Sequence, residues 1–128
     1  MLCPKPRKIR QVNVDSLDEL KAKLLHFAQE RDWEQFQSPK NLVMALCGEM
    51  GELAECFQWL SEAQSRDLSA EQRGKVADEI ADLQLYLILL AARLDMDIAA
   101  ECRRKLELNA VKYPVEKARG RTNKYTEL

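Results

Sequence analysis

The segment CGEMGELAECFQWL, residues 47–60, places Glu49, Glu52 and Glu55 three residues apart inside an apolar pattern typical of a buried helix. At 100° per residue, Glu49 and Glu52 lie along the border of an apolar stripe rather than on the solvent side. The stripe consists of Leu42, Leu46, Met50, Leu53, Phe57 and Leu60. Taking a carboxylate out of water costs several kcal/mol unless a cation compensates, so this segment predicts both a packed helix and a nearby positive charge.

A second segment has the same arrangement, because Glu79 and Asp82 border another helical stripe. That stripe consists of Val76, Leu83, Leu87, Leu90 and Leu94. Packing the two stripes together would bring Glu49, Glu52, Glu79 and Asp82 to one edge of the interface. Four carboxylates there repel one another unless a divalent cation is bound. All-oxygen ligation favours Mg²⁺, with Mn²⁺ as a substitute.

An alternative explanation of these acids remains open at this stage. They could be helix-surface carboxylates that pair with Arg73, Lys75 or Arg93. A single E-x-x-E pair is well explained in that way. Two matching pairs, each beside an apolar stripe and each with an aromatic residue on the same side, favour the metal site.

Length and charge place the chain among single-domain proteins that do not bind nucleic acid. It has 128 residues and a net charge of -1. Residues 45–101 carry four bases and twelve acids, whereas residues 102–128 carry eight bases and three acids. An acidic middle and a small net charge argue against nucleic-acid binding. The N-terminus lacks a signal-peptide pattern and the longest apolar run is too short to span a bilayer, so we expect no membrane association and a cytoplasmic location.

Caps and apolar periods predict four helices and no strand. The first begins at Asp15 or Ser16 and runs to about Trp33, the second from Pro39 to about Leu60. The third follows the Ser69 cap to about Leu94, the fourth follows Asp97 and ends before Pro114, and residues 61–68 form a loop. We therefore expect an all-α protein with a basic arm (1–14), a helical catalytic domain (15–113) and an irregular basic tail (114–128).

The fourth predicted helix adds positive charge. Lys105, Asn109 and Lys112 recur at helical spacing and share one face. Ammonium and amide donors suit the oxygens of a polyphosphate.

Several ordered motifs make the chain similar to a known family. The acid pairs are Glu49-Met50-Gly51-Glu52 and Glu79-Ile80-Ala81-Asp82, and ERDWEQF (30–36), GELAE.FQW (51–59), KYP (112–114) and KYT (124–126) accompany them. Together they resemble the all-α nucleoside triphosphate pyrophosphohydrolases of the MazG-like superfamily, and within it the dCTP pyrophosphatases.

The resemblance implies a four-helix bundle of the all-α NTP pyrophosphatase type, assembled as a homo-oligomer, with a tetramer favoured over a dimer and a site built partly from a neighbouring chain. It implies that Glu49, Glu52, Glu79 and Asp82 are catalytic and bind Mg²⁺. It also implies a base and sugar pocket lined by Trp33, Glu34, Gln35, Phe36, Gln37, Trp59 and Tyr86. Leu24 replaces a family histidine that contacts the substrate, which leaves the base preference open.

The expected reaction is Mg²⁺-dependent hydrolysis of a nucleoside triphosphate, dCTP or a related or modified deoxynucleotide, to the monophosphate and pyrophosphate. Such an enzyme would cleanse the nucleotide pool. Glu52 or Glu55 would orient the attacking water. The leaving pyrophosphate would be held by Lys105, Asn109, Lys112 and Lys124. The alternative hypothesis is a non-catalytic, oligomeric helical binding or scaffold module.

Overall fold

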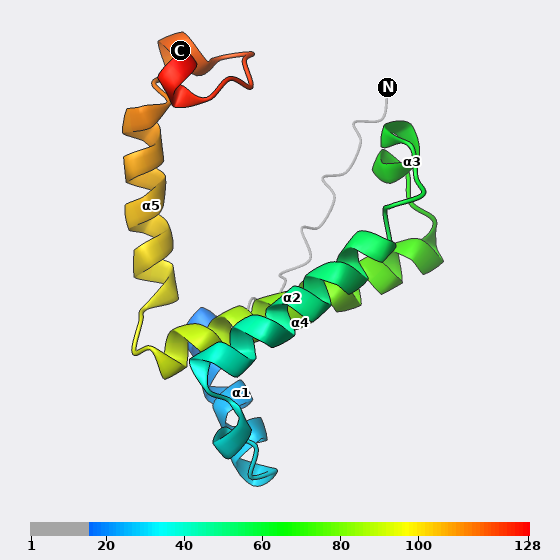
Figure 1. Cartoon of the computed structure of the whole chain (residues 1–128), viewed down its shortest axis with the longest axis vertical. Helices are drawn as coiled ribbons and strands as arrows, with labels where there is room; N and C mark the ends of the chain where they lie inside the picture. Colours follow the sequence, from blue (N-terminus) through cyan, green and yellow to red (C-terminus); the bar gives the residue numbers. More distant parts are fainter. Residues whose placement is uncertain (1–15) are drawn as a thin grey trace, which may run out of the picture.

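The computed structural model describes residues 16–128, so the predicted basic arm and the possible Asp15 cap lie outside the described residues. Over this range the chain is helical and contains no strand, which confirms the all-α prediction (Figure 1). The elements are α1 (Leu17–Glu30), η1 (Glu34–Phe36), α2 (Pro39–Glu55), α3 (Glu62–Arg66), α4 (Ala70–Arg93), α5 (Ile98–Lys112), α6 (Val115–Ala118) and η2 (Tyr125–Glu127).

Side-chain caps fix where the four long helices begin, as the sequence predicted. The Oγ atoms of Ser16 and Ser38 each accept a hydrogen bond from a backbone N–H of the first turn, at 3.2 Å. Ser69 and Gln72 form a reciprocal capping box at the start of α4. The carboxylate of Asp97 caps α5 at 2.9 Å. Each cap satisfies an N–H that would otherwise lack an intrahelical partner.

The first two helices end earlier than predicted. α1 stops at Glu30 rather than near Trp33, because Asp32 adopts a left-handed conformation (φ 53°). The N–H of Trp33 then donates to the carbonyl of Ala28 at 3.0 Å, and the N–H of Asp32 donates to Gln29 at 3.1 Å. This is a Schellman termination with Asp in the position usually taken by Gly, so the sequence carried no glycine signal for it. α2 ends at Glu55 and continues as a turn over residues 56–59.

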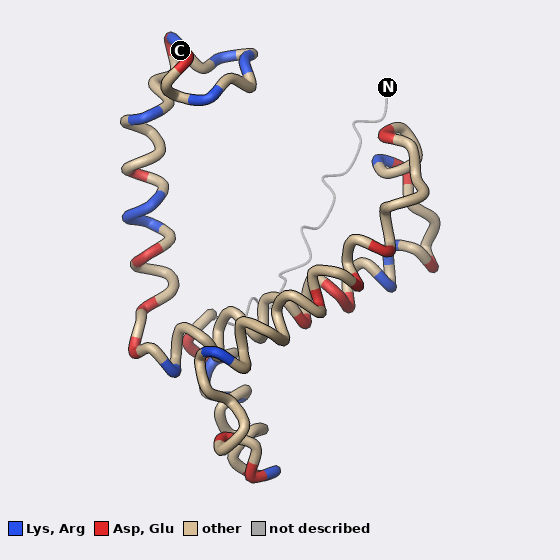
Figure 2. Tube along the Cα trace, in the orientation of Figure 1, with Lys and Arg blue, Asp and Glu red and all other residues tan. Residues whose placement is uncertain are grey.

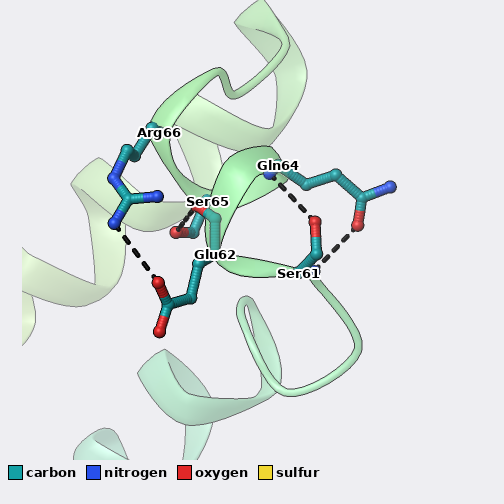
Figure 3. Close-up of polar contacts among 5 residues, drawn as sticks. All are labelled: Ser61, Glu62, Gln64, Ser65 and Arg66. Atoms are coloured by element: carbon teal, nitrogen blue, oxygen red, sulfur yellow. Dashed lines mark hydrogen bonds and ion pairs between the residues drawn. The ribbon is translucent and has the colours of Figure 1, made fainter.

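The prediction of an unstructured loop at residues 61–68 is wrong, because this segment contains the short helix α3 (Figure 3). Ser61 and Gln64 form a second capping box, at 3.2 and 2.9 Å. The Ser65 hydroxyl donates to the Glu62 carbonyl, and Arg66 pairs with the Glu62 carboxylate at 3.3 Å. The polar residues that suggested a loop are therefore helix-capping and i,i+4 pairs.

α2 and α4 run antiparallel and side by side, and the N-terminal α1 packs against α4 (Figure 1). The buried side chains of the described residues all come from these three helices. They are Ala28, Leu42, Val76, Ile88 and Leu89.

The predicted stripe on the third helix was partly wrong. Leu87 and Leu94 are 42% and 44% exposed, whereas Ile88 and Leu89, outside the stripe, are buried. The reason is that α4 packs against two helices, α1 and α2, whereas a single apolar stripe assumes one packing partner.

α5 does not join this three-helix unit. It leaves the end of α4 after a second left-handed residue, Asp95 (φ 53°), and runs away from the α2–α4 pair (Figure 1). A single chain thus packs three of its long helices together, and the predicted four-helix bundle stays a prediction. The tail that follows α5 was predicted to be irregular. It is so only in part, because it contains the short helices α6 and η2.

Three further predictions concern membrane association, the division of the chain and its location. None of the helices described in residues 16–128 has both the length and the apolar character needed to cross a membrane. The division into arm, domain and tail stays a prediction, and so does the cytoplasmic location.

Truncating the largest fully buried side chain of the described residues should destabilise the three-helix unit. We expect Ile88→Ala, at a site 2% exposed, to lower the free energy of unfolding by about 2–5 kcal/mol, because it removes apolar contacts and leaves a cavity. Gln84→Ala, at an exposed site on the same helix, should change it by less than about 0.5 kcal/mol. Urea denaturation followed by circular dichroism measures both. Equal effects of the two variants would contradict the assigned core.

Candidate functional site

Three carboxylates from the two paired helices come together in the middle of the α2–α4 pair. Glu49 on α2 and Glu79 and Asp82 on α4 each offer one oxygen, and these oxygens all lie within 4.8 Å of one another. Glu49 and Glu79 are half-buried and Asp82 is exposed. Figure 2 shows acidic positions gathered along this part of the two helices. We call Glu49, Glu79 and Asp82 the acidic cluster.

The acidic cluster is electrostatically unfavourable on its own. Loss of hydration raises the pKa of Glu49, and a hydrogen bond with Glu52 and the charges of Glu52, Asp82 and Glu79 raise it further. Loss of hydration also raises the pKa of Glu79, with the charges of Glu52, Asp82 and Asp78 adding to it. Glu52 thus interacts with the cluster, although its oxygens lie outside the set of three. Glu49 and Glu79 therefore hold a proton more tightly than an ordinary glutamate, because ionising either one places a charge in a poorly hydrated and already negative site.

The donor set fits a hard divalent cation. Oε2 of Glu79 is buried and has no hydrogen-bond partner among the described residues, although a buried carboxylate oxygen normally has one. Two of the cations that could have neutralised the acids bind elsewhere. Lys75 lies 3.1 Å from Glu71, and Arg93 lies 3.9 Å from Glu34. Mg²⁺ and Mn²⁺ are bound by oxygen ligands, and the unpaired carboxylate oxygen of Glu79 could serve as one.

A cavity of about 290 Å³ opens beside the acidic cluster, and Glu49 and Asp82 form part of its wall. Its other walls are mostly apolar and aromatic, and Phe27 and Trp33 meet edge to face with ring centroids 5.8 Å apart. The remaining lining residues are Leu24, Ala28, Gln37, Leu85, Tyr86 and Leu89. A flat ring bound here would leave its polar substituents next to the carboxylates.

A second cavity, of about 240 Å³, shares the Trp33, Gln37 and Tyr86 side chains with the first. These three side chains therefore belong to the walls of both cavities. The rest of the second cavity is formed by Phe36, Asn41, Leu42 and Ala45.

Two residues predicted for the base pocket face elsewhere. Glu34 is directed towards Arg93, and Nε2 of Gln35 donates to the carbonyl and carboxylate oxygens of Asp32 at 3.0 and 3.2 Å. Trp59 lies in the turn after α2 and is 87% exposed, so it lines neither cavity. Of the predicted pocket residues, this chain alone brings together Trp33, Phe36, Gln37 and Tyr86.

The predicted phosphate-binding residues are separate from the acidic cluster in this chain. Lys105, Asn109 and Lys112 lie on α5, and Lys124 lies beyond it in the C-terminal segment. Figure 2 shows Lys and Arg positions along α5 and at its tip, away from the α2–α4 pair. The ammonium group of Lys112 sits 5.1 Å from the centre of the Tyr125 ring.

Sequence reasoning missed several residues of the site. Phe27 could have been found, because it lies one helical turn after Leu24 and shares its face. Leu85 and Asn41 carried no signal. Arg93 was read only as a possible partner of surface acids, whereas it contacts the 33–37 loop, 56 residues away in sequence from Gln37.

The raised pKa values of Glu49 and Glu79 predict a specific pH dependence. Above pH 4.5, their ordinary value, the metal-free folded protein holds more protons than the unfolded chain, so its free energy of unfolding should fall as the pH rises through the raised values. Glu79→Gln should reduce this slope, because the glutamine carries no charge to repel its neighbours. Urea denaturation in EDTA between pH 4.5 and 7.5 tests this. Identical slopes for the variant and the parent protein would contradict the assigned repulsion.

Known proteins with similar sequences are nucleotide-hydrolysing enzymes. The chain is 42% identical over 115 residues to dCTP pyrophosphatase 1 of Rattus norvegicus, which covers 88% of this chain and 68% of that protein. It is 41% identical to dCTP pyrophosphatase 1 of Homo sapiens, with the same coverage. A crystal structure of a pyrophosphatase from Archaeoglobus fulgidus matches with a TM-score of 0.73 and 32% identity, over 81% of this chain and 99% of that chain.

A family model also matches the part of the chain that contains both acid pairs and the basic C-terminal segment. It is described as the MazG-like family and covers residues 44–128. The helical fold, the acid motifs and these relatives agree. This chain belongs to the MazG-like family.

Proposed function

We propose that this protein is a Mg²⁺-dependent nucleoside triphosphate pyrophosphohydrolase. Its substrate is dCTP or a related or modified deoxynucleotide, and its products are the monophosphate and pyrophosphate. The observation that carries the proposal is the position of the acidic cluster, which forms part of the wall of an aromatic cavity. The names of the relatives support the reaction and the base class.

The acidic cluster would hold Mg²⁺, with Glu52 beside it as the fourth carboxylate. When bound, the ion neutralises charge on phosphate oxygens and makes the phosphorus a better electrophile. Glu52 would accept a hydrogen bond from the attacking water, and its interactions with Glu49 and Glu79 support this role. Glu55 is the weaker choice. It lines a hollow of about 440 Å³ together with Glu52 and Glu79, but of the two candidates only Glu52 contributes to the raised pKa values of Glu49 and Glu79.

The aromatic cavity would take the base. Trp33 and Tyr86 offer ring faces, and Gln37 offers a carboxamide for hydrogen bonds. Leu24 lines this cavity, so the position at which the family resemblance implies a histidine is apolar here. Base preference then depends on the polar groups that remain in the wall.

We also propose that the working protein is a homo-oligomer, with a tetramer favoured over a dimer. Apolar side chains are widely exposed in one chain, including Met50 (54%), Leu106 (69%) and Val111 (80%). Surface of this kind on a soluble enzyme is normally covered by a partner. In such an assembly a neighbouring chain would bring Lys105, Asn109 and Lys112 of its α5 to the triphosphate, together with its Lys124. The Trp59 of a neighbouring chain would contact the base.

Removing one carboxylate of the acidic cluster should abolish turnover without unfolding the protein. We expect Glu49→Gln or Asp82→Asn to lower kcat at least about 100-fold, because charge that develops in the transition state is no longer stabilised. The assay is pyrophosphate release with Mg²⁺ from a panel of canonical and modified nucleoside triphosphates. Circular dichroism checks that the helical content is unchanged.

The matched control is Glu62→Gln on α3, where the carboxylate is 91% exposed and pairs with Arg66. It should keep the activity of the parent protein. Full activity of both cluster variants would refute the metal assignment. No pyrophosphate from any member of the panel, together with a melting temperature that ignores Mg²⁺, would favour the non-catalytic scaffold instead.

A shared active site makes a prediction about mixed oligomers. Glu49→Gln and the double variant Lys105→Ala/Lys112→Ala should each be nearly inactive alone. Co-expressed, they should recover about a quarter of the activity, because some sites then combine an intact acidic cluster with an intact α5 from the neighbouring chain. Activity of the mixture is compared with the sum of the two separate variants. No recovery would place both sets of residues in the same chain.

A further inference from the structure

An arginine at the end of α4 holds one residue of the cavity wall. Nη2 of Arg93 donates to Oε1 of Gln37 at 2.9 Å, and Nη1 lies 3.9 Å from Oε1 of Glu34. The Arg93 side chain is 23% exposed and that of Glu34 is 49% exposed. Gln37 is half-buried, so the contact with Gln37 is the better buried one. Arg93 itself lines neither cavity, and Gln37 lines both.

The chemistry of the guanidinium group fixes which way the Gln37 carboxamide faces. Arginine has only N–H donors, so the group it contacts must be an acceptor. The carboxamide oxygen therefore faces Arg93, and the NH₂ group faces the opposite way. Within residues 16–128 no other hydrogen bond of this side chain is found. Without Arg93 this hydrogen bond would be lost, and the carboxamide could rotate so that either its oxygen or its NH₂ group faces the cavity.

The backbone of the loop is held independently of Arg93. The N–H of Gln37 donates to the carbonyl of Glu34 at 3.1 Å. Nδ2 of Asn41 donates to the carbonyl of Phe36 at 3.0 Å, and Asp32 ends α1 by its left-handed conformation. Loss of Arg93 would then release the Gln37 side chain and leave the loop in place.

The position of Arg93 is poorly explained by stability alone. Its Nε is buried and has no hydrogen-bond partner among the described residues. A buried donor without a partner costs free energy. A residue that only anchored the end of α4 could do so with an exposed side chain, as cations at helix C-termini usually do.

We propose that Arg93 is a positioning residue for base recognition: it holds the Gln37 carboxamide so that its NH₂ group is presented to an acceptor on the base. The acceptor is a ring carbonyl or an unprotonated ring nitrogen. This inference rests on the proposed function, because it assigns the nucleobase to the cavity beside the acidic cluster. Arg93 acts only through Gln37 and touches no substrate.

A double-mutant cycle between Arg93 and Gln37 tests the inference. We expect Arg93→Met to raise KM for the preferred triphosphate about tenfold, the worth of one hydrogen bond, and to change kcat by less than about twofold. In a Gln37→Ala background, Arg93→Met should cost nothing further, because the group it positions is gone. Arg93→Lys, which keeps one donor, should recover part of the loss.

Two more variants complete the design. Gln37→Glu can still accept from Arg93 but has no N–H donor, so it should raise KM at least as much as Arg93→Met. Arg66→Met on α3 is the matched control, since Arg66 is a 72% exposed arginine in a surface ion pair, and it should leave both constants unchanged. If Arg93→Met does not fold, Gln37→Glu and Arg93→Lys still decide the question.

The inference is overturned if Arg93→Met costs as much in the Gln37→Ala background as in the parent protein, or if it lowers kcat equally for every base. The same cycle measured by calorimetry with nucleoside monophosphates needs no turnover. Parent protein that binds monophosphates but releases no pyrophosphate would refute the proposed reaction and leave the cycle to decide the role of Arg93. Parent protein that binds no nucleotide would refute both.

Discussion

The pairing of α2 with α4 brings like charges together, and much of the site follows from that constraint. Glu49, Glu79 and Asp82 are placed within reach of one another by apolar contacts that have nothing to do with charge. The cost of the repulsion is met elsewhere, by burial of side chains such as Leu42 and Val76. A cation bound at the cluster would relieve the repulsion. The apolar packing that holds the carboxylates together would therefore favour cation binding.

The cavity beside the cluster depends on how α1 ends. Because Asp32 reverses the chain in a left-handed conformation, Trp33 returns to contact Phe27 on the same helix. The following 33–37 loop then lies against α4, where Arg93 and Tyr86 meet it. The same three helices and this loop thus form an apolar hollow whose wall includes two carboxylates of the acidic cluster, Glu49 and Asp82.

One chain leaves this arrangement incomplete. Much apolar surface is exposed, and the basic groups of α5 stand away from the acidic cluster (Figure 2). A triphosphate bound at the cluster would carry more negative charge than one divalent ion balances, so further cations are needed. In the proposed oligomer a neighbouring copy would bring the acidic and basic elements together and would also cover the exposed apolar side chains.

The sequence by itself determined where the four long helices begin and how the acids of each pair are spaced. Ser16, Ser38, Ser69 and Asp97 are local signals, since a cap depends only on residues within one turn, and the structure has a helix at each of them. The spacing of two residues on one helix, such as Glu79 and Asp82, is likewise fixed by its period. Only the tertiary structure decided that α4 packs against two helices, that α5 stands apart, and that Arg93 reaches Gln37. Those contacts join residues far apart in sequence, and no local pattern records which faces will meet.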